Sequence, residues 1–331
     1  MAGESVSINK GRFYEGTAVC VTGGTGFVGR HIVDELLKQG AYVRIPVHKR
    51  PLPLANKRIQ GIQGDLLNEE DCQKIAEGID YLFHAAGSVG AAGVGSVGQM
   101  NSIIQNLALT ANILKAAWVT GVKRVLLFSS STVYPVTDHP VREEEGWSGP
   151  VHPSYFGYGW MRRYLEKLGE FVAEKSGLQI ALVRPTAVYG RHDNFNPSES
   201  HVIPALIRKA VDKTDPYIVW GSGKEVRDFL HVTDLARGCL LTLEKYATCD
   251  PVNVGSAQDM TIHELVNLIL RVAGHENARV MFDDTMPVTI PYRRIDMTKA
   301  NKILGFTPLI SIEEGITDTL NWYKTQDKKD P

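Results

Sequence analysis

The chain has 331 residues, 43% of them hydrophobic and 22% charged, and its formal net charge is −1. This length can bury the core of one large domain or of two modest ones, and the composition is that of ordinary soluble proteins. The near-zero charge excludes a global basic field for nucleic acid, and no apolar stretch approaches the roughly 20 residues that a membrane helix needs.

The N-terminal segment and the cysteines favour a soluble protein of the cytoplasm. The first residues, MAGESVSINKGRFYEG, carry charges and lack the apolar region of a signal peptide. The cysteines have no CxxC or CxxH spacing, so we expect free thiols in a reducing compartment and no metal site. They are Cys20, Cys72, Cys239 and Cys249.

The first half of the chain alternates strand and helix patterns. Short apolar runs predict strands at residues 18–22, 42–47, 80–84 and 124–128. Helical spacing predicts helices at residues 26–39, at about 101–119 and from about 154 to 175. This alternation predicts an α/β fold with a doubly wound, parallel Rossmann sheet covered by helices on both faces.

A glycine-rich turn, TGGTGFVG at residues 22–29, joins the first predicted strand to the first helix. In this context it is typical of a dinucleotide-binding fingerprint. Gly23 permits the tight turn, Gly26 lets the backbone approach a pyrophosphate, and Gly29 permits close packing of helix on strand. The positive end of the helix would hold the phosphates. The cofactor-binding residues expected here are Gly23, Thr25, Gly26, Phe27, Val28 and Gly29.

The end of the second predicted strand distinguishes the two forms of the cofactor. An NAD site usually has Asp or Glu there to bond the ribose 2′-OH. Here His48, Lys49 and Arg50 follow the strand without a carboxylate, which favours the 2′-phosphate of NADP. NAD and simply solvated cations are the alternatives. Further on, Asp65, which precedes Leu66, could bond the adenine amino group or cap a helix.

A stretch rich in Gly, Ala and Ser, residues 85–98, follows the predicted strand at 80–84. Loops at the carboxyl ends of such strands border the ligand crevice. We therefore expect Ala85, Ala86 and Gly87 to contact the cofactor, with a plain surface linker as the alternative.

Three polar side chains are candidates for proton transfer to a ketone. Tyr158 and Arg162 are four residues apart, so they share one face of the predicted helix, and the guanidinium would favour the ionised phenol. The run Ser129-Ser130-Ser131-Thr132 follows the strand ending at residue 128, and one of its hydroxyls could bond the carbonyl oxygen beside the phenol. Ketone reduction needs such a donor and such a cation. Taken alone, Tyr158 would be better explained as an aromatic on the helix surface.

After residue 184 the elements become shorter and prolines more frequent. Residues 1–184 are predicted to form the dinucleotide-binding domain with the helix that carries Tyr158. Residues 185–331 are predicted to form mainly a smaller substrate-binding domain, from which some segments return to the first.

These motifs resemble those of the extended short-chain dehydrogenases/reductases, the NAD(P)-dependent sugar epimerase/dehydratase family, over about residues 17–326. The resemblance is strongest to the GDP-L-fucose synthase branch of that family. It is carried by FGYGWMRR at 156–163, RPT at 184–186, VYG at 188–190, HDNF at 192–195, SHVIPAL at 200–206, VWGSG at 219–223 and RDFLHV at 227–232.

The resemblance implies roles for single residues. Ser130 would be the catalytic serine and Tyr158 the general acid, while Arg162 stands where the family has a lysine that holds the nicotinamide ribose. Pro185 and Val188 would line the nicotinamide pocket. Other implied residues are Asn106 as a support of the site, Arg227 on the substrate diphosphate, and Trp220, Asn194 and His201 at the substrate. A surface ion pair of Arg227 with Asp228, simple packing of Trp220, and a structural role of His201 at a helix start are the alternatives.

The sequence departs from the family pattern at two positions. Arg162 keeps the charge of the usual lysine, but its planar fork is not interchangeable with an ammonium. Thr132 occupies the position of the cysteine base that, with a histidine matched by His201, epimerises carbons 3 and 5 in fucose synthases. A hydroxyl is a poor base, because its pKa is far above the value of about 8.5 for a thiol. We therefore expect double epimerisation to be lost or altered.

The leading hypothesis is an NADP(H)-dependent reductase of a nucleotide-linked 4-keto-6-deoxy sugar, with a GDP-sugar favoured. The alternatives are a nucleotide-sugar 4-epimerase, a fucose synthase-like epimerase/reductase, and a dinucleotide-binding protein without turnover. The family habit also implies a homodimer through the helices near residues 101–119 and 158–175, although their apolar faces would equally pack on the sheet. Neither nucleic acid nor a membrane is an expected partner.

Overall fold

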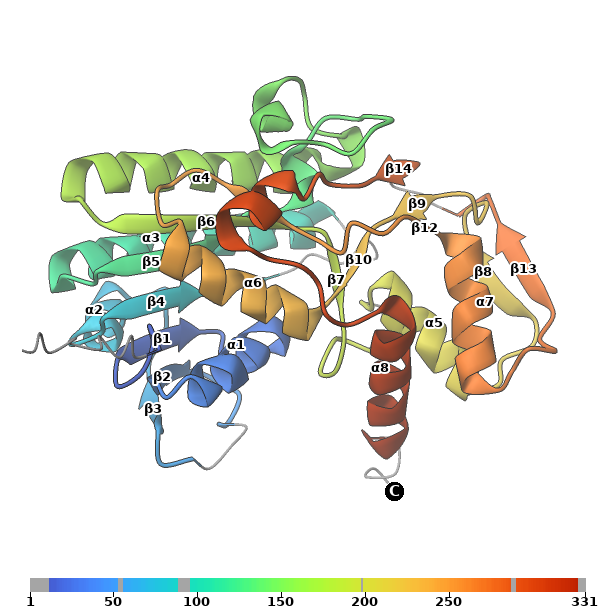
Figure 1. The fold of residues 1–331 in the computed structure, drawn as a ribbon, viewed down its shortest axis with the longest axis horizontal. Helices are drawn as coiled ribbons and strands as arrows, with labels where there is room; N and C mark the ends of the chain where they lie inside the picture. Colours follow the sequence, from blue (N-terminus) through green and yellow to red (C-terminus); the bar gives the residue numbers. More distant parts are fainter. Residues whose placement is uncertain (1–11, 53–55, 89–95, 198, 287–289, 327–331) are drawn as a thin grey trace, which may run out of the picture.

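The computed structural model describes residues 12–52, 56–88, 96–197, 199–286 and 290–326. Its centre is a parallel sheet of seven strands in the order β11-β6-β5-β4-β1-β2-β3 (Figure 1). The strands are β1 (Ala18–Thr22), β2 (Tyr42–Val47), β3 (Ile59–Gln63), β4 (Tyr81–His84), β5 (Arg124–Phe128), β6 (Gln179–Pro185) and β11 (Val252–Val254). The predicted α/β class with a doubly wound Rossmann sheet is confirmed.

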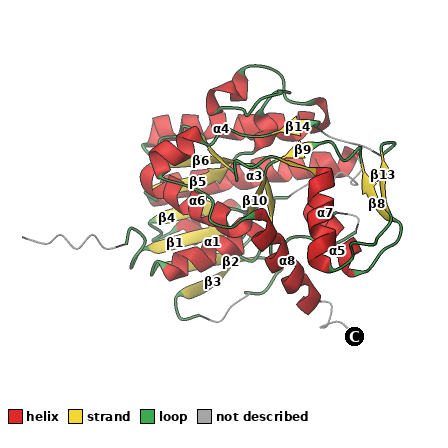
Figure 2. Cartoon of the chain, turned by 45° about the vertical axis from the view of Figure 1, so that its right-hand side comes forward, coloured by secondary structure: helices red, strands yellow, loops and turns green. Residues whose placement is uncertain are grey.

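Helices cover both faces of this sheet, as Figure 2 shows. Because successive side chains of a strand point to opposite faces, Val19 and Val21 lie in one core layer and Cys20 in the other. One layer is covered by α1 (Phe27–Lys38) and α6 (Val232–Lys245), which pack on each other. The opposite layer is covered by α2 (Glu69–Ala76), α3 (Ser96–Thr120) and α4 (Phe156–Ser176).

Helix α3 begins about one turn earlier than the predicted start near residue 101. Its first turns bury Ser102, Asn106 and Thr110 rather than apolar side chains. Residues 96–98, predicted as the end of the glycine-rich loop, are helical.

The second half of the chain forms a smaller group of elements beyond the carboxyl end of β6 (Figure 1). Its apolar core includes Leu265, Ile269 and Ile316. Its elements are β7 (Ala187–Tyr189), α5 (Val202–Val211), β8 (Tyr217–Trp220), β9 (Val226–Arg227), β10 (Phe229–His231), β12 (Met260–Thr261), α7 (Ile262–Ala273), β13 (Val280–Asp283), β14 (Tyr292–Arg293) and α8 (Ile312–Gln326).

Two elements of this half, α6 and β11, lie with the central sheet, where β11 pairs with β6. Strand β6 itself spans the proposed domain boundary after residue 184. Among the residues described, no helix is both long and apolar enough to cross a membrane.

Candidate active site

The glycine turn lies against the segment that follows β4. Strands β1 and β4 are neighbours where the strand order reverses, which is where doubly wound sheets bind ligands. Gly23 has a φ of 70°, and a Cβ there would lie 2.7 Å from backbone atoms of Ala85 and Ala86. A Cβ at Gly29 would overlap the carbonyl oxygen of Gly23. Both positions therefore require glycine.

The start of α1 fits the phosphates of a dinucleotide. Gly26 is the N-cap residue, and no side chain caps the helix. Backbone N–H groups of the first turn, which begins with Phe27 and Val28, are therefore open to an anion. Thr25 is half-buried within the turn.

A buried histidine fixes the segment after β4. Thr22 Oγ1 accepts a hydrogen bond from the Ala86 amide at 3.3 Å and lies 2.8 Å from His84 Nδ1, while His84 Nε2 lies 3.1 Å from Thr110 Oγ1 of α3. The Thr22 hydroxyl is then free to donate to Nδ1, which assigns the ring proton to Nε2. Burial lowers the pKa of His84 to about 3, so the neutral ring joins β1, β4 and α3.

Asn106 of α3 contacts Gly87 and Ser88, which continue the segment after β4. Its Oδ1 accepts from the Ser88 amide at 3.0 Å, and its Nδ2 donates to the Ser88 carbonyl oxygen at 2.7 Å. A Cβ at Gly87 would lie 2.8 Å from Asn106 Oδ1. Residues 89–95 of the predicted glycine-rich loop lie outside the described residues.

The cations that follow β2 are exposed. His48, Lys49 and Arg50 all lie at the carboxyl end of the strand, and His48 Nε2 is 4.0 Å from Asp65 Oδ2. Asp65 Oδ1 accepts from the Leu67 amide at 3.0 Å.

The alternative role of Asp65 as the cap of α2 is wrong, because Asn68 is the N-cap residue and accepts from the Asp71 amide at 3.0 Å. The side chain of Leu66 belongs to the core and is only 8% exposed. Only its main chain could face a cofactor.

Tyr158 and Arg162 lie on one face of α4, as their spacing predicts. Arg162 Nη2 donates to Tyr158 Oη at 2.6 Å, and Arg162 Nη1 donates to the carbonyl oxygen of Phe128 at 2.7 Å. The guanidinium thus joins the phenol to the end of β5, the strand that precedes Ser129 and Ser130.

The fold brings residues 129–134, here called the serine segment, against α4 at Gly159, the residue after Tyr158. Ser130 caps a short 3₁₀ turn, and its Oγ accepts from the Thr132 amide at 3.2 Å. Its hydroxyl donates to no acceptor among the described residues. A Cβ at Gly159 would lie 2.6 Å from the carbonyl oxygen of Thr132. The hydroxyl of Thr132 is buried and has no hydrogen-bond partner within the described ranges.

His201 is the N-cap residue of α5, and its Nδ1 lies 3.2 Å from Asp193 Oδ1. The hydrogen bond to Asp193 raises the pKa of His201. Asn194 is exposed, and its Nδ2 contacts Glu199 Oε2 at 3.4 Å. Among described residues, no hydrogen bond joins His201 to Thr132 or Tyr158, so the structure groups His201 with Asp193 rather than with the serine segment.

Two arginines stand side by side on paired strands, with Arg227 of β9 opposite Arg293 of β14. Arg293 is only 6% exposed, and it donates to the carbonyl oxygens of Pro135 and Tyr134 at 3.3 and 3.4 Å. In the described part of the chain, neither arginine forms an ion pair. Adjacent, largely buried cations are costly unless an anion binds them. Sequence reasoning missed Arg293, because nothing in the local pattern places it beside Arg227.

The alternative pairing of Arg227 with Asp228 is wrong. Asp228 is fully buried, and its carboxylate accepts hydrogen bonds from Ser256 and Ala257. Burial raises the pKa of Asp228 to about 6, so this carboxyl group does not titrate as an exposed aspartate would.

The other expected ligand contacts lie in strands of the second half or at the end of β6. Trp220 ends β8 and is 53% exposed. Pro185 ends β6, and Val188 lies in β7 opposite Leu230 of β10. Two shallow hollows of about 490 and 430 Å³, around Pro140, contain none of the candidate residues.

The sheet, the glycine turn and the Tyr158–Arg162 pair define a dinucleotide-binding α/β enzyme. Residues 19–255 match the model of the NAD dependent epimerase/dehydratase family, and the chain belongs to this family. The expected family and the expected class, an NAD(P)-dependent oxidoreductase or epimerase, are confirmed.

Curated relatives and solved structures agree with this family. The chain is 31% identical to the putative GDP-L-fucose synthase 2 of Arabidopsis thaliana, over 92% of this chain and 91% of the relative. It is 31% identical to dTDP-4-dehydro-6-deoxy-D-allose reductase of a Streptomyces species, over 94% and 97%. The structure of UDP-N-acetylglucosamine 4-epimerase from Methanobrevibacter ruminantium has a TM-score of 0.84 at 26% identity, over 94% and 99% of the two chains.

Proposed function

We propose that the protein is an NADP(H)-dependent reductase of a nucleotide-linked 4-keto-6-deoxy sugar, with a GDP-sugar favoured. The observation that carries this proposal is the 2.6 Å hydrogen bond from Arg162 Nη2 to Tyr158 Oη, on the helix that packs against the turn capped by Ser130. The relatives named as a GDP-L-fucose synthase and as a dTDP-4-dehydro-6-deoxy sugar reductase support this substrate class.

The side chains would divide the chemistry among them. A reduced nicotinamide, when bound, supplies the hydride that the ketone carbon takes up. Tyr158 gives its proton to the ketone oxygen, and Arg162 stabilises the phenolate that this leaves. Ser130 donates a hydrogen bond to the same oxygen. Because Arg162 is also tied to the Phe128 carbonyl, its charge stays beside the phenol.

Arg227 and Arg293 would hold the diphosphate of the substrate. They are adjacent in register, and a diphosphate could pair with both guanidinium groups, neither of which forms an ion pair among the described residues. Trp220, Asn194 and His201 would contact the nucleoside and sugar. This assigns substrate recognition mainly to residues 185–331.

His48, Lys49 and Arg50 support NADP as the favoured cofactor. They are exposed where β2 ends, and cations there suit a ribose 2′-phosphate. Pro185 and Val188 would line the nicotinamide end, and Ala85, Ala86 and Gly87 the dinucleotide crevice.

Thr132 limits the reaction that we propose. Its hydroxyl is buried at the position of the family's cysteine base, and a hydroxyl of ordinary acidity does not deprotonate carbon efficiently. We therefore propose reduction without full 3,5-epimerase activity.

We also propose a homodimer through α3 and α4. Both helices bury one side on the sheet and leave large apolar side chains exposed on the other. These exposed side chains are Met100, Ile104 and Trp118 on α3, and Phe156, Trp160, Tyr164 and Phe171 on α4. Sedimentation analysis of Trp160→Glu against the natural chain tests the dimer, since a charge there should yield monomers.

The four cysteines are free, which fits the proposed cytoplasmic location.

Cofactor stoichiometry tests the proposed reaction. The purified protein is incubated with NADPH and a GDP-linked 4-keto-6-deoxyhexose, and both consumption of NADPH and the product sugar are measured. We expect one NADPH oxidised for each sugar reduced. A nucleotide-sugar 4-epimerase would interconvert sugars without net consumption, and a protein without turnover would bind NADPH but form no product.

A further inference from the structure

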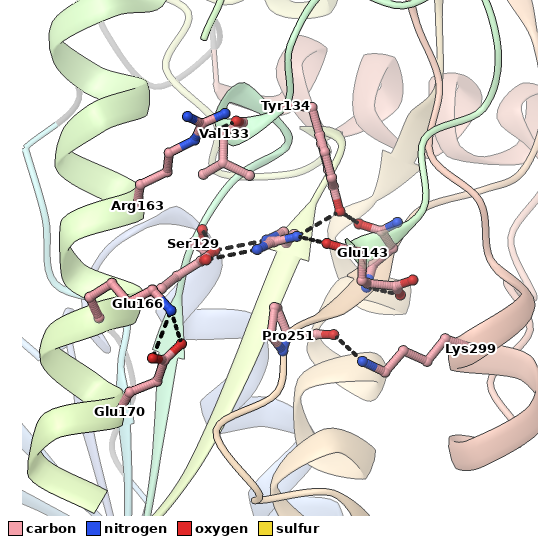
Figure 3. A network of polar contacts seen from close by, with 12 residues as sticks. Ser129, Val133, Tyr134, Glu143, Arg163, Glu166, Glu170, Pro251 and Lys299 are labelled. Atoms are coloured by element: carbon pink, nitrogen blue, oxygen red, sulfur yellow. Dashed lines mark hydrogen bonds and ion pairs between the residues drawn. The ribbon is translucent and has the colours of Figure 1, made fainter. Parts of the chain in front are cut away.

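A buried ion pair lies behind the serine segment, between α4 and β6. Arg184 Nε donates to Glu166 Oε1 at 2.8 Å, and Arg184 Nη2 donates to Glu166 Oε2 at 2.7 Å. Their side chains are only 1% and 3% exposed. Figure 3 shows Glu166, Ser129 and Tyr134 in the polar network around this pair.

The ion pair holds the first residue of the serine segment, residues 129–134. Ser129 Oγ donates to Glu166 Oε1 at 2.5 Å, and Ser129 directly precedes the candidate catalytic Ser130. Glu166 follows Arg162 by four residues and Tyr158 by eight, so all three lie on the same face of α4. One carboxylate therefore joins the helix of the general acid to the segment of the serine.

The same ion pair holds the last residue of this segment. Arg184 Nη1 donates to Tyr134 Oη at 3.1 Å, and Tyr134 Oη donates to Asn253 Oδ1 at 2.6 Å. Tyr134 is fully buried. The serine segment is thus fixed at both ends, with Ser130 and Thr132 between them.

A contribution to folding stability does not by itself explain why this ion pair is buried. Removing two charges from water is costly, and apolar side chains of similar volume often replace a buried ion pair without loss of stability. Apolar packing does not fix hydroxyl positions as directional hydrogen bonds do. Catalysis depends on such positions, because a shift of about 1 Å can cost about 10²-fold in rate.

We propose that Glu166 and Arg184 are positioning residues that set the place of Ser130 relative to Tyr158 and Arg162. They do not touch the substrate, and they act through Ser129 and Tyr134. This inference rests on the proposed reductase function for its kinetic consequence, but the order of residues 129–134 is a consequence that does not depend on it.

The first test releases one end of the segment at a time. In Ser129→Ala and Tyr134→Phe, the Glu166–Arg184 pair is retained. We expect kcat for reduction to fall by about tenfold or more while the Kd for NADPH stays unchanged. Tyr217→Phe is the matched control, because Tyr217 is buried and donates one hydrogen bond, to the Leu206 carbonyl oxygen at 2.7 Å, far along the chain. Its kcat should not change.

The second test separates positioning from stability. In the double variant Glu166→Leu/Arg184→Met, apolar packing should preserve the folded state, which thermal unfolding checks. We expect kcat to fall here as well. A folded double variant with the kcat of the natural chain would overturn the inference.

Amide hydrogen exchange, measured by mass spectrometry, tests the positioning role without any measurement of catalytic activity. The peptide that covers residues 129–134 should exchange faster in Ser129→Ala, Tyr134→Phe and the double variant than in the natural chain and Tyr217→Phe. Unchanged exchange in all three would overturn the positioning role. Faster exchange in a protein that reduces no keto-sugar nucleotide would uphold that role and reject the proposed reaction instead.

Discussion

Arg162 connects the phenol of Tyr158 to the main chain at the end of β5. Its Nη2 donates to Tyr158 Oη at 2.6 Å and its Nη1 to the Phe128 carbonyl oxygen at 2.7 Å. A guanidinium can make both contacts at once because its donors are spread over a planar fork. The arginine therefore places a positive charge beside the phenol and also ties the helix to the strand.

This geometry predicts different results for two replacements of Arg162. Arg162→Lys should keep or raise the rate of reduction, since an ammonium can still lie beside the phenol. Arg162→Met removes the charge and should lower kcat by about 10²-fold or more. Steady-state kinetics measures both. Total loss of activity in a folded Arg162→Lys variant would count against the proposed mechanism.

The cations after β2 predict the cofactor preference. Lys49→Ala/Arg50→Ala should raise the Kd for NADPH by about tenfold or more, because each charge-assisted hydrogen bond contributes about 1.5–3 kcal/mol. The Kd for NADH should change little. Lys57→Ala/Arg58→Ala is the control, because these exposed residues precede β3 at the opposite end of the sheet. Equal weakening of both cofactors by the first variant would contradict a 2′-phosphate contact.

Thr132 predicts the fate of the hydrogens at carbons 3 and 5. The natural chain, reacted in deuterium oxide, should not incorporate deuterium at both carbons. Thr132→Cys supplies a thiol, whose ordinary pKa is about 8.5, and should gain exchange at one or both carbons, while Thr132→Ser should not. Mass spectrometry of the product sugar measures the label. Incorporation at both carbons by the natural chain would contradict the proposed loss of double epimerisation.

The sequence was sufficient to predict the parts of the fold that depend on local pattern. The apolar runs of β1, β2 and β5 and the glycine turn follow from residue spacing, and the pairing of Tyr158 with Arg162 follows from the helix repeat.

Contacts between distant segments could not be predicted in this way. Arg293 reaches Arg227 only because β14 pairs with β9, and nothing in the sequence around either residue encodes that register. The start of α3 carries Gly98 and follows a run rich in glycine and alanine, so the local pattern favours a loop where the structure has a helix. The burial of Asp228 likewise depends on the loop after β11, which supplies its donors.

The neutral, buried His84 predicts a loss of stability in acid. Its pKa is lowered to about 3 by burial, against an ordinary value of 6.5. Between these values the unfolded chain binds a proton that the folded chain does not, so the free energy of unfolding falls as pH falls. The slope from this group is about 1.4 kcal/mol per pH unit.

Urea titrations across this pH range measure that slope. His84→Asn should reduce the dependence of the unfolding free energy on pH. Part of this dependence should remain, because burial also lowers the pKa values of His192 and His231 to about 4. His139→Asn is the control, because the hydrogen bonds of His139 to Glu145 and Asp138 raise its pKa, and its removal should not flatten the slope. An unchanged slope in His84→Asn would show that His84 is not buried as a neutral ring.

The most direct test of the proposed reduction is a single-turnover measurement of NADPH oxidation with a nucleotide-linked 4-keto-6-deoxy sugar. Tyr158→Phe removes one hydroxyl and should slow this step by about 10²- to 10⁴-fold, with the Kd for NADPH unchanged. Tyr164→Phe, on the same helix with its side chain 58% exposed, should react at the natural rate. If Tyr158→Phe also reacted at the natural rate, Tyr158 would not be the proton donor, and the account of this site would be wrong.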